Sequence, residues 1–156
     1  IRGYISEFMQ LYSNNIRVID SMPIPVCEFG RAHFSKCFKG EASYGICASK
    51  KETYFGFKFH ALTTVDGFLT DYVITPANID DRNAVWDLCD KYRSISIIGD
   101  KGYINKRLTP ELKSERDIDL LFLKRENSRD NYPKEVRQLL FKVRRRIETS
   151  FSQLTG

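Results

Sequence analysis

The sequence predicts a mixed α/β domain in which helices cover a central sheet. Short apolar runs alternate with helical patterns along the chain, a turn dipeptide joins two of the runs, and the last segment has a helical period. At 156 residues with 42% hydrophobic content, the chain is long enough to bury one sizeable core. We therefore expect a single domain.

The first half of the chain is predicted to contain a strand and a hairpin. The strand covers 17–25 and ends in proline-rich sequence, and residues 27–50 lack clear periodicity, which is typical of a long irregular connection. Two runs rich in β-branched and aromatic residues follow over 54–65 and 68–75. The Asp66-Gly67 dipeptide between them is a strong hairpin signal.

Helices and buried strands alternate in the second half. A helix over 80–90 begins with Asp80 and Asp81, which have turn and capping roles there. Apolar runs over 94–99 and 118–123 predict buried strands, with a helix over 105–116 between them and a polar surface loop over 125–132 after them. This order of elements favours parallel pairing at the centre of the sheet.

The final segment is predicted to be one long amphipathic helix over 133–154. At about 100° per residue its apolar side chains form one stripe, made of Val136, Leu139, Leu140, Val143, Ile147, Phe151 and Leu154. Glu148 falls roughly 100° from the centre of the stripe, at the margin between core and solvent. Arg144 lies one turn earlier on the same flank, where it can pair with Glu148 or contact a phosphate.

Three acidic residues far apart in the sequence are placed where they can meet at one edge of the sheet. Asp20 ends the first strand, Asp100 ends the strand over 94–99, and Glu148 lies on the last helix. Mg²⁺ and Mn²⁺ take oxygen ligands, and two metals about 3.5 to 4 Å apart can clamp both oxygens of a phosphodiester displacement. These carboxylates are therefore candidate catalytic and metal-ligating residues. Taken singly, each has a structural explanation: a turn for Asp20, a cap for Asp100 and an exposed ion pair for Glu148.

The net charge of +5 is unevenly distributed along the chain. Residues 101–156 carry 14 Lys and Arg against 8 Asp and Glu, whereas the first hundred residues sum to −1. A basic surface beside carboxylates suits a polyanion, because Lys and Arg offset the repulsion between phosphates and acidic ligands. For the run Arg144-Arg-Arg146 alone, a solvated helix face is the alternative.

Composition and patterning exclude several classes of protein. No apolar run approaches the roughly 18 residues of a spanning helix, and the first residues lack the order of a signal peptide. We therefore expect a cytoplasmic protein without a membrane partner. The four cysteines form no C-x-x-C pair and do not have the usual zinc spacings, so we expect reduced thiols.

Four motifs occur in the order and with the separations of a known family. They are Asp20-Ser-Met-Pro-Ile-Pro-Val-Cys27, Ala48-Ser-Lys-Lys-Glu-Thr-Tyr-Phe-Gly-Phe-Lys-Phe-His60, Gly99-Asp-Lys-Gly-Tyr103 and Arg144-Arg-Arg-Ile-Glu148. Together they resemble the catalytic domain of bacterial insertion-sequence transposases of the DDE type, from about Val18 to the end of the chain. The resemblance implies a ribonuclease H-like fold.

The resemblance also implies a site and a reaction. Asp20 would bridge two Mg²⁺ ions, Asp100 would bind one and Glu148 the other, and Mn²⁺ can substitute. Hydrolysis at the transposon end would precede attack of the freed 3′-hydroxyl on target DNA, without a covalent protein intermediate. The implied partners are double-stranded DNA, as terminal inverted repeats and as target, and a second copy of the full-length protein. The protein would act at the bacterial nucleoid.

Six residues near the carboxylates are expected to contact DNA: Lys58, His60, Lys101, Tyr103, Arg144 and Arg145. Lys58 and His60 share one face of a strand whose aromatic side chains point to the other face. Lys101 and Tyr103 directly follow Asp100, where they can meet a phosphate or a flipped base. The structural alternatives are a lysine that protects a strand edge and a tyrosine that packs in the core.

The chain departs from the family pattern in two ways. A related branch has Tyr, Arg, Glu and Lys along the last helix, where this chain has Phe141, Arg144, Glu148 and Thr155. It also has almost no room before Asp20 for a domain that binds terminal repeats, so it looks like a catalytic core cut at both ends, or a decayed element. Two alternatives stay open: an inactive remnant that only binds DNA, and another ribonuclease H-like nuclease that never joins strands.

Overall fold

The computed structural model of the chain describes residues 15–47, 51–103, 106–122 and 132–155. The described elements are, in chain order, β1 (Ile16–Cys27), α2 (Phe29–Ala32), β2 (Ser43–Cys47), β3 (Glu52–Thr64), β4 (Leu69–Pro76), α3 (Asp81–Cys89), β5 (Ser96–Gly99), η1 (Lys101–Tyr103), α4 (Leu108–Arg116), β6 (Asp119–Phe122) and α5 (Lys134–Thr155).

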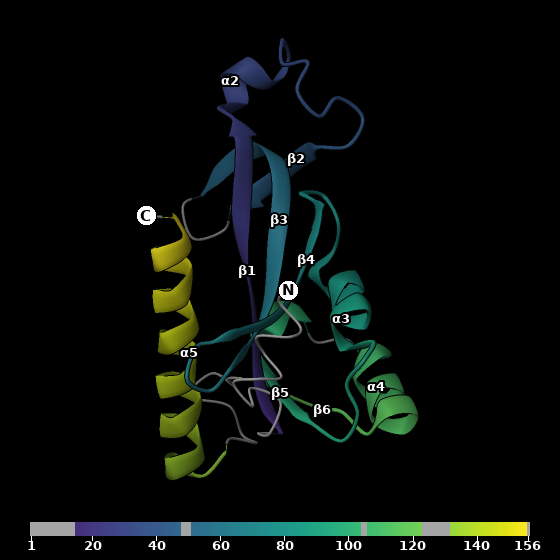
Figure 1. Cartoon of the computed structure of the whole chain (residues 1–156), viewed down its shortest axis with the longest axis vertical. Helices are drawn as coiled ribbons and strands as arrows, with labels where there is room; N and C mark the ends of the chain where they lie inside the picture. The colour runs from purple at the N-terminus through teal and green to yellow at the C-terminus, as the bar shows by residue number, and fades with distance from the viewer. Residues whose placement is uncertain (1–14, 48–50, 104–105, 123–131, 156) are drawn as a thin grey trace.

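The described strands form one mixed sheet with β1 near its centre (Figure 1). The order is β2-β3-β1-β5-β6, and β4 pairs with the part of β3 that follows its pairing with β2. β1 is antiparallel to β3, whereas β1 with β5 and β5 with β6 are parallel pairs. The predictions of a mixed α/β class and of central parallel pairing are confirmed.

Helices pack on both faces of this sheet, so the molecule has two cores. On one face, α5 places Leu140, Val143 and Ile147 against Val18 and Ile98. On the other face, helices α3 and α4 pack against Ile19, Leu62 and Ile97 (Figure 1). Because successive residues of a strand point to opposite faces, the even-numbered residues at this height of β1 and β5 face α5 and the odd-numbered ones face α3 and α4.

Helix α5 is attached to the β3–β4 turn as well as to the sheet. Arg146 donates from Nη1 to Asp66 Oδ1 at 3.0 Å, and the Ser150 hydroxyl donates to the carbonyl oxygen of Gly67 at 3.0 Å. The helix has the predicted extent within a residue at each end, and the described side chains of its apolar stripe are buried except that of Val136, which is 39% exposed. The hairpin turn and the apolar stripe together fix the position of α5 on the sheet.

The connection over 27–50 is more regular than the sequence predicts. β1 continues to Cys27, the short helix α2 follows, and β2 pairs antiparallel with the start of β3. Prolines 23 and 25 do not end β1, because at this height β1 pairs with β3 on one side and its pairing with β5 covers only Ile16–Val18. An open strand edge tolerates residues that lack an N–H group.

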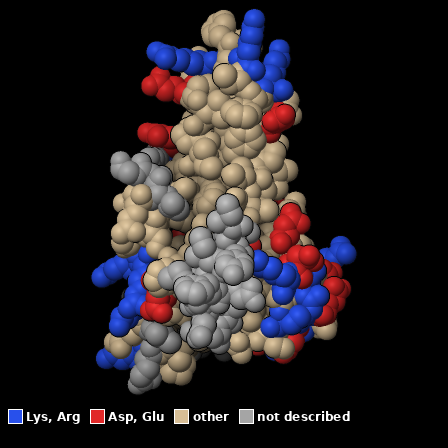
Figure 2. Space-filling view, viewed as in Figure 1, with Lys and Arg blue, Asp and Glu red and all other residues tan. Residues whose placement is uncertain are grey.

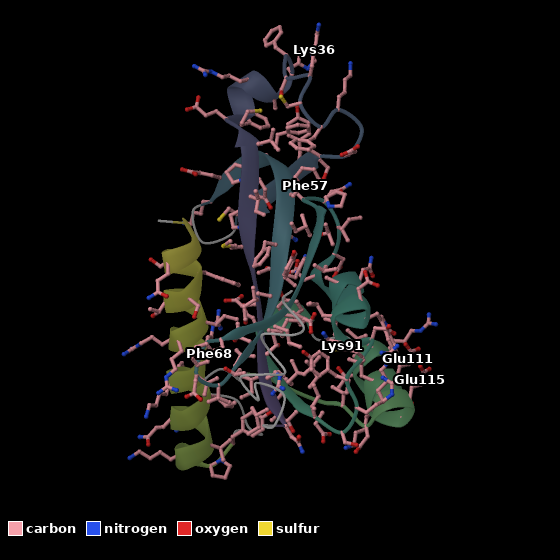
Figure 3. The ribbon with its side chains drawn as sticks, viewed as in Figure 1. Lys36, Phe57, Phe68, Lys91, Glu111 and Glu115 are labelled. Carbon is pink, nitrogen blue, oxygen red and sulfur yellow. The ribbon has the colours of Figure 1, made fainter. Side chains whose placement is uncertain are left out.

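The other predicted elements are confirmed with small changes at their ends. Asp80 is the N-cap of α3, where its side chain accepts from the backbone N–H of Arg82. α4 begins at Leu108, so that Pro110 lies in its first turn, where a missing N–H costs little. Glu111 and Glu115 lie on the side of α4 that faces away from the sheet (Figure 3). Of the loop predicted over 125–132, all but the last residue lies outside the described part of the chain.

Among the described helices, none has the length and the apolar composition needed to cross a membrane.

The turn that holds α5 gives a testable prediction about stability. Gly67 and Gly40 have nearly the same positive φ, of 92° and 91°, but a Cβ on Gly67 would lie 2.9 Å from Ser150 Oγ while one on Gly40 meets nothing within 4 Å. Both alanine variants should lose about 1–2 kcal/mol from backbone strain. Gly67→Ala should lose about 1 kcal/mol more in urea unfolding, because Ser150 must release its hydrogen bond. Equal losses in the two variants would contradict this role of the turn.

Candidate active site

Two of the predicted site residues lie side by side just beyond the parallel pairing of β1 with β5. Asp100 directly follows β5 as predicted, whereas Asp20 lies within β1, which continues to Cys27, so the prediction that Asp20 ends its strand is wrong. The register pairs Arg17 with Ile97 and Val18 with Ile98, and the same offset brings Asp20 level with Asp100. Both carboxylates follow even-numbered core residues that face α5, so both point to that side of the sheet. A small cavity there is lined by Val18, Ile19, Asp20, Ile98, Gly99, Asp100 and Arg144.

The close approach of the two strands depends on Gly99. A Cβ on Gly99 would lie 2.7 Å from Ile19 Cγ2, which is closer than side chains pack. Any larger residue would push β5 away from β1 just before Asp100.

Helix α5 brings the third carboxylate, that of Glu148, near Asp100, and Arg144 on the same helix contacts both. Arg144 Nη2 lies 3.4 Å from Asp100 Oδ2, and Arg144 Nε lies 3.5 Å from Glu148 Oε1. One guanidinium therefore lies between the carboxylate of a strand and the carboxylate of a helix. Asp100 and Glu148 are 50% and 59% exposed, so this group opens to solvent.

Asp20 differs from the other two because it is largely buried. The pKa of Asp20 is raised to about 6, chiefly by desolvation on burial and to a smaller extent by the nearby charges of Asp100 and Glu148. The backbone N–H of Ser21, which donates to Asp20 Oδ1 at 2.8 Å, and the charge of Arg144 act in the opposite direction. Asp20, Asp100, Glu148 and Arg144 thus share one electrostatic environment, which we call the acidic site.

The donor chemistry of the acidic site suits a hard divalent cation, although the present arrangement does not form a finished metal centre. Three carboxylates from three elements supply the oxygen ligands that such ions prefer. Among the described side chains, however, no three His, Cys, Asp or Glu groups are placed to hold a metal ion as they stand. Arg144 supplies the positive charge between Asp100 and Glu148, so a cation that binds there must replace its contacts.

Lys58 and His60, expected at the DNA, belong to the interior of the fold. Phe59 packs on the α5 face and His60 lies on the opposite face, so the predicted alternation is confirmed. Lys58 Nζ lies 2.6 Å from Asp81 Oδ1 and donates to the carbonyl oxygen of Ile79. His60 is fully buried, and this burial lowers its pKa to about 4, so the ring is neutral at pH 7. Contact with DNA would require both side chains to leave these partners.

Tyr103 is also buried, with 1% of its surface exposed, because its ring packs in the core beneath α3 and α4. Burial raises the pKa of its hydroxyl, which therefore stays protonated. The packed tyrosine was one of the sequence alternatives, and the structure favours it over a direct DNA contact. Lys101 begins η1, but its side chain lies outside the described part of the chain.

The remaining predicted DNA contacts, Arg144 and Arg145, lie on α5 beside a shallow hollow. The hollow is lined by four cations, Lys142, Arg144, Arg145 and Arg146, and it also includes Glu148. Figure 2 shows Lys and Arg side chains along the outer side of α5. A phosphate backbone that follows this helix would therefore pass directly beside the acidic site.

Two residues with a structural part in this region were not singled out from the sequence. Ser21 donates its backbone N–H to Asp20 Oδ1, and Asp81, interpreted as a capping residue, pairs with Lys58. The pairing of Asp81 with Lys58 has no local sequence signal, because the partners are separated by many residues and meet only when the sheet and α3 have formed.

The burial of Asp20 predicts how stability depends on pH without metal. A carboxyl whose folded pKa is about 6 binds its proton more tightly when folded, so stability falls as pH rises from about 4 to above 6. Asp20→Asn should therefore stabilise the metal-free protein by roughly 2 kcal/mol at pH 8 and by little at pH 4. Urea unfolding with chelator present measures this, with the exposed Asp87→Asn as control. A gain that is equal at both pH values would contradict the burial effect.

The chain matches the family model described as "Transposase DDE domain" over residues 11–156. No curated protein matches the chain. Among solved structures, the cryo-EM structure of a piggyBac transposase synaptic complex with hairpin DNA is similar at a TM-score of 0.47, with 13% identity, over 79% of this chain and 25% of that chain. This chain thus spans about a quarter of that protein's chain. Because the family model covers nearly the whole sequence, the chain belongs to the transposase DDE domain family.

Proposed function

We propose that this chain is the catalytic core of a transposase with a ribonuclease H-like fold, which cuts DNA at transposon ends and joins the freed 3′ end to target DNA. Transposase DDE domains generally use divalent metals. The observation that carries the proposal is the acidic site itself. Adjacent parallel strands present Asp20 and Asp100 on one face, and α5 brings Glu148 to the guanidinium that Asp100 also contacts.

Asp20, Asp100 and Glu148 would hold the metal. Two Mg²⁺ ions, for which Mn²⁺ can substitute, would supply an activated oxygen nucleophile and stabilise the departing oxygen when bound. Asp20 must lose its proton before it can ligate, and its raised pKa means that metal affinity should fall as pH drops below about 6. No side-chain nucleophile is needed for this reaction.

Arg144 would have two roles, one before metal binds and one after. Without metal it neutralises Asp100 and Glu148, and once these carboxylates ligate a cation its guanidinium is available for a DNA phosphate. Arg145 and the other cations of the hollow would bind the neighbouring phosphates of double-stranded DNA, whether transposon end or target. Two DNA ends must be brought together for transposition, so we propose that the full-length protein acts as a homodimer.

The second candidate is a noncatalytic remnant that binds DNA through the same hollow. The observation in its favour is that Arg144 contacts both Asp100 and Glu148. In addition, among the described residues no three ligand side chains are placed to hold a metal ion as they stand. A third reading, a related nuclease that never joins strands, differs from a transposase only in its products. Metal binding separates the remnant from the two enzymes, and strand-transfer products separate the enzymes from each other.

The catalytic proposal predicts a metal titration in which one carboxylate is decisive. The wild type should bind Mn²⁺ in calorimetry and nick supercoiled plasmid. Asp100→Asn should fold normally but lose metal binding and nicking, because it replaces a charged carboxylate ligand with a neutral amide. The exposed Asp87→Asn on α3 should behave as the wild type. If the wild type binds no Mn²⁺ at millimolar concentration, the remnant becomes the better account.

The proposed exchange of Arg144 for metal predicts an unusual result. Arg144→Gln should tighten Mn²⁺ binding in the absence of DNA by about fivefold, since a partly exposed ion pair contributes about 1 kcal/mol. Lys142→Gln removes the same charge from the same helix without removing a contact of Asp20, Asp100 or Glu148 among the described side chains, so it controls for the general loss of positive charge. A weaker affinity in Arg144→Gln would show that Arg144 supports the metal geometry.

A further inference from the structure

We propose that residues 28–42, which form one end of the molecule and which we call the tip, bind unpaired bases of a DNA strand that lies across the acidic site. The exposed ring of Phe34 is the surface on which a base stacks. The inference rests on the proposed function, because it extends the path of the same DNA to a second place on the molecule.

The tip projects beyond the part of the sheet that the helices cover. It consists of α2 and the loop that leads to β2, and it lies at the opposite end of the molecule from β5 and β6 (Figure 1). Its base is attached to the sheet, because the Ser43 hydroxyl donates to Asn78 Oδ1 at 2.8 Å and accepts from the Asn78 backbone N–H at 2.9 Å. The tip is therefore held at its base and exposed at its outer end.

Aromatic rings on the tip face solvent. Phe34 is 83% exposed, the highest value among the large apolar side chains that the structure describes, and Phe29 and Phe38 are 57% and 55% exposed. Phe38 has a φ of 53°, a strained value for a bulky residue, and its carbonyl oxygen accepts from the backbone N–H groups of Glu41 and Ala42. Residues held in such conformations cluster at ligand-binding sites. Exposed aromatic rings are surfaces on which unpaired bases stack.

The charge of the tip favours a nucleic acid as the partner. Residues 29–40 contain three cations, Arg31, Lys36 and Lys39, and no Asp or Glu. Figure 2 shows Lys and Arg side chains gathered at this end of the molecule, and Figure 3 shows Lys36 at its outer end. Arg31 lies 4.0 Å from Glu28, but the two side chains are 82% and 85% exposed, so this pair is weak. Cations that flank aromatic rings match the phosphates and bases of a single strand.

The tip also adjoins the face of the sheet that carries the acidic site. Met22, two residues after Asp20 on β1, packs in the core beneath α5. Ile24 is the next residue on this face, and it pairs with Phe57 of β3. The ring of Phe38 packs edge-on against that of Phe57, with 5.3 Å between the ring centroids. One face of β1 and β3 thus leads from the acidic site to the tip.

The length of β1 gives the spacing between the two DNA contacts. Cys27, the last residue of β1, comes seven residues after Asp20, which corresponds to about 23 Å along a strand. One strand of duplex DNA advances about 3.4 Å per nucleotide. A DNA strand with one phosphate at the carboxylates would therefore reach the base of the tip after about seven nucleotides.

The experiment measures DNA binding by the full chain with chelator present, so that it does not depend on metal or on catalysis. Fluorescence anisotropy compares a labelled single-stranded oligo(dT) with a blunt duplex of the same length. Phe34→Leu keeps an apolar side chain and removes the ring, whereas Phe34→Trp keeps a ring. Phe68→Leu is the matched control, because Phe68 is 49% exposed and lies at the turn that holds α5, far from the tip (Figure 3).

The ring of Phe34 should matter only for unpaired bases. Phe34→Leu should weaken binding of oligo(dT) about tenfold, the usual effect of losing one base–aromatic stack, and should change binding of the blunt duplex by less than about twofold. Phe34→Trp should keep the wild-type affinity, and the fluorescence of the added tryptophan should fall when oligo(dT) binds. This signal is read as the difference from the wild type, whose one tryptophan, Trp86, lies on α3.

The cations of the tip should appear in the salt dependence of binding. The triple variant Arg31→Gln, Lys36→Gln, Lys39→Gln removes three positive charges without touching the rings. Each phosphate contact with a single strand contributes about 0.7 to the slope of log affinity against log salt. The slope for oligo(dT) should therefore be smaller by about 2 in the triple variant.

Several results would overturn the inference. Wild-type affinity for oligo(dT) in Phe34→Leu would show that no base stacks on the ring, and would leave an apolar protein surface as the partner of the tip. A loss that Phe34→Trp or Phe68→Leu shares, or that is equal on the blunt duplex, would exclude stacking at this position. An unchanged salt slope in the triple variant would show that the strand does not pass the tip.

The proposed function is tested separately by the Mn²⁺ titration. If Phe34→Leu binds oligo(dT) as the wild type does while Asp100→Asn abolishes Mn²⁺ binding, the inference fails and the proposed function stands. If the wild type binds oligo(dT) through Phe34 and binds no Mn²⁺, the contact at the tip stands and the catalytic proposal gives way to the noncatalytic remnant.

Discussion

The parallel pairing of β1 with β5 is the constraint on which the rest of the acidic site depends. It sets a register in which residues separated by 80 positions, such as Val18 and Ile98, lie opposite one another, so two distant aspartates meet at one sheet edge. The odd-numbered residues between them form the core beneath α3 and α4, and the even-numbered ones receive α5. A slip of one residue would send the carboxylates to opposite faces.

Positively charged side chains offset the three carboxylates that the register brings together at the acidic site. Three carboxylates that converge on one place repel each other, and this repulsion adds to the larger effect of burial in raising the pKa of Asp20 to about 6. Arg144 reduces the repulsion from within the same helix as Glu148, while Lys142, Arg145 and Arg146 keep the surrounding surface positive. The site is therefore suited both to a cation and to a polyanion, which is what a metal-dependent reaction on DNA requires.

The sequence was sufficient for most elements and for the proximity of Asp20 and Asp100, because both depend on local patterns. Apolar runs predicted β5 and β6, and the Asp66-Gly67 turn predicted the hairpin. Asp100 directly follows β5 as predicted, whereas Asp20 lies within β1. The sequence was insufficient for β2, whose five residues have no strong period, and for Lys58, His60 and Tyr103. The alternation on β3 gave the face on which Lys58 and His60 lie, but only the tertiary packing of α3 and η1 decides that this face is internal.

The measurement that tests this account most directly is anomalous diffraction at the manganese edge from crystals of the chain grown with Mn²⁺. The account predicts Mn²⁺ density between Asp20, Asp100 and Glu148, with the Arg144 guanidinium withdrawn from both Asp100 and Glu148. Density only at other places, or a site in which Arg144 keeps both contacts at saturating Mn²⁺, would contradict the claim that these carboxylates form the metal-binding centre of the domain.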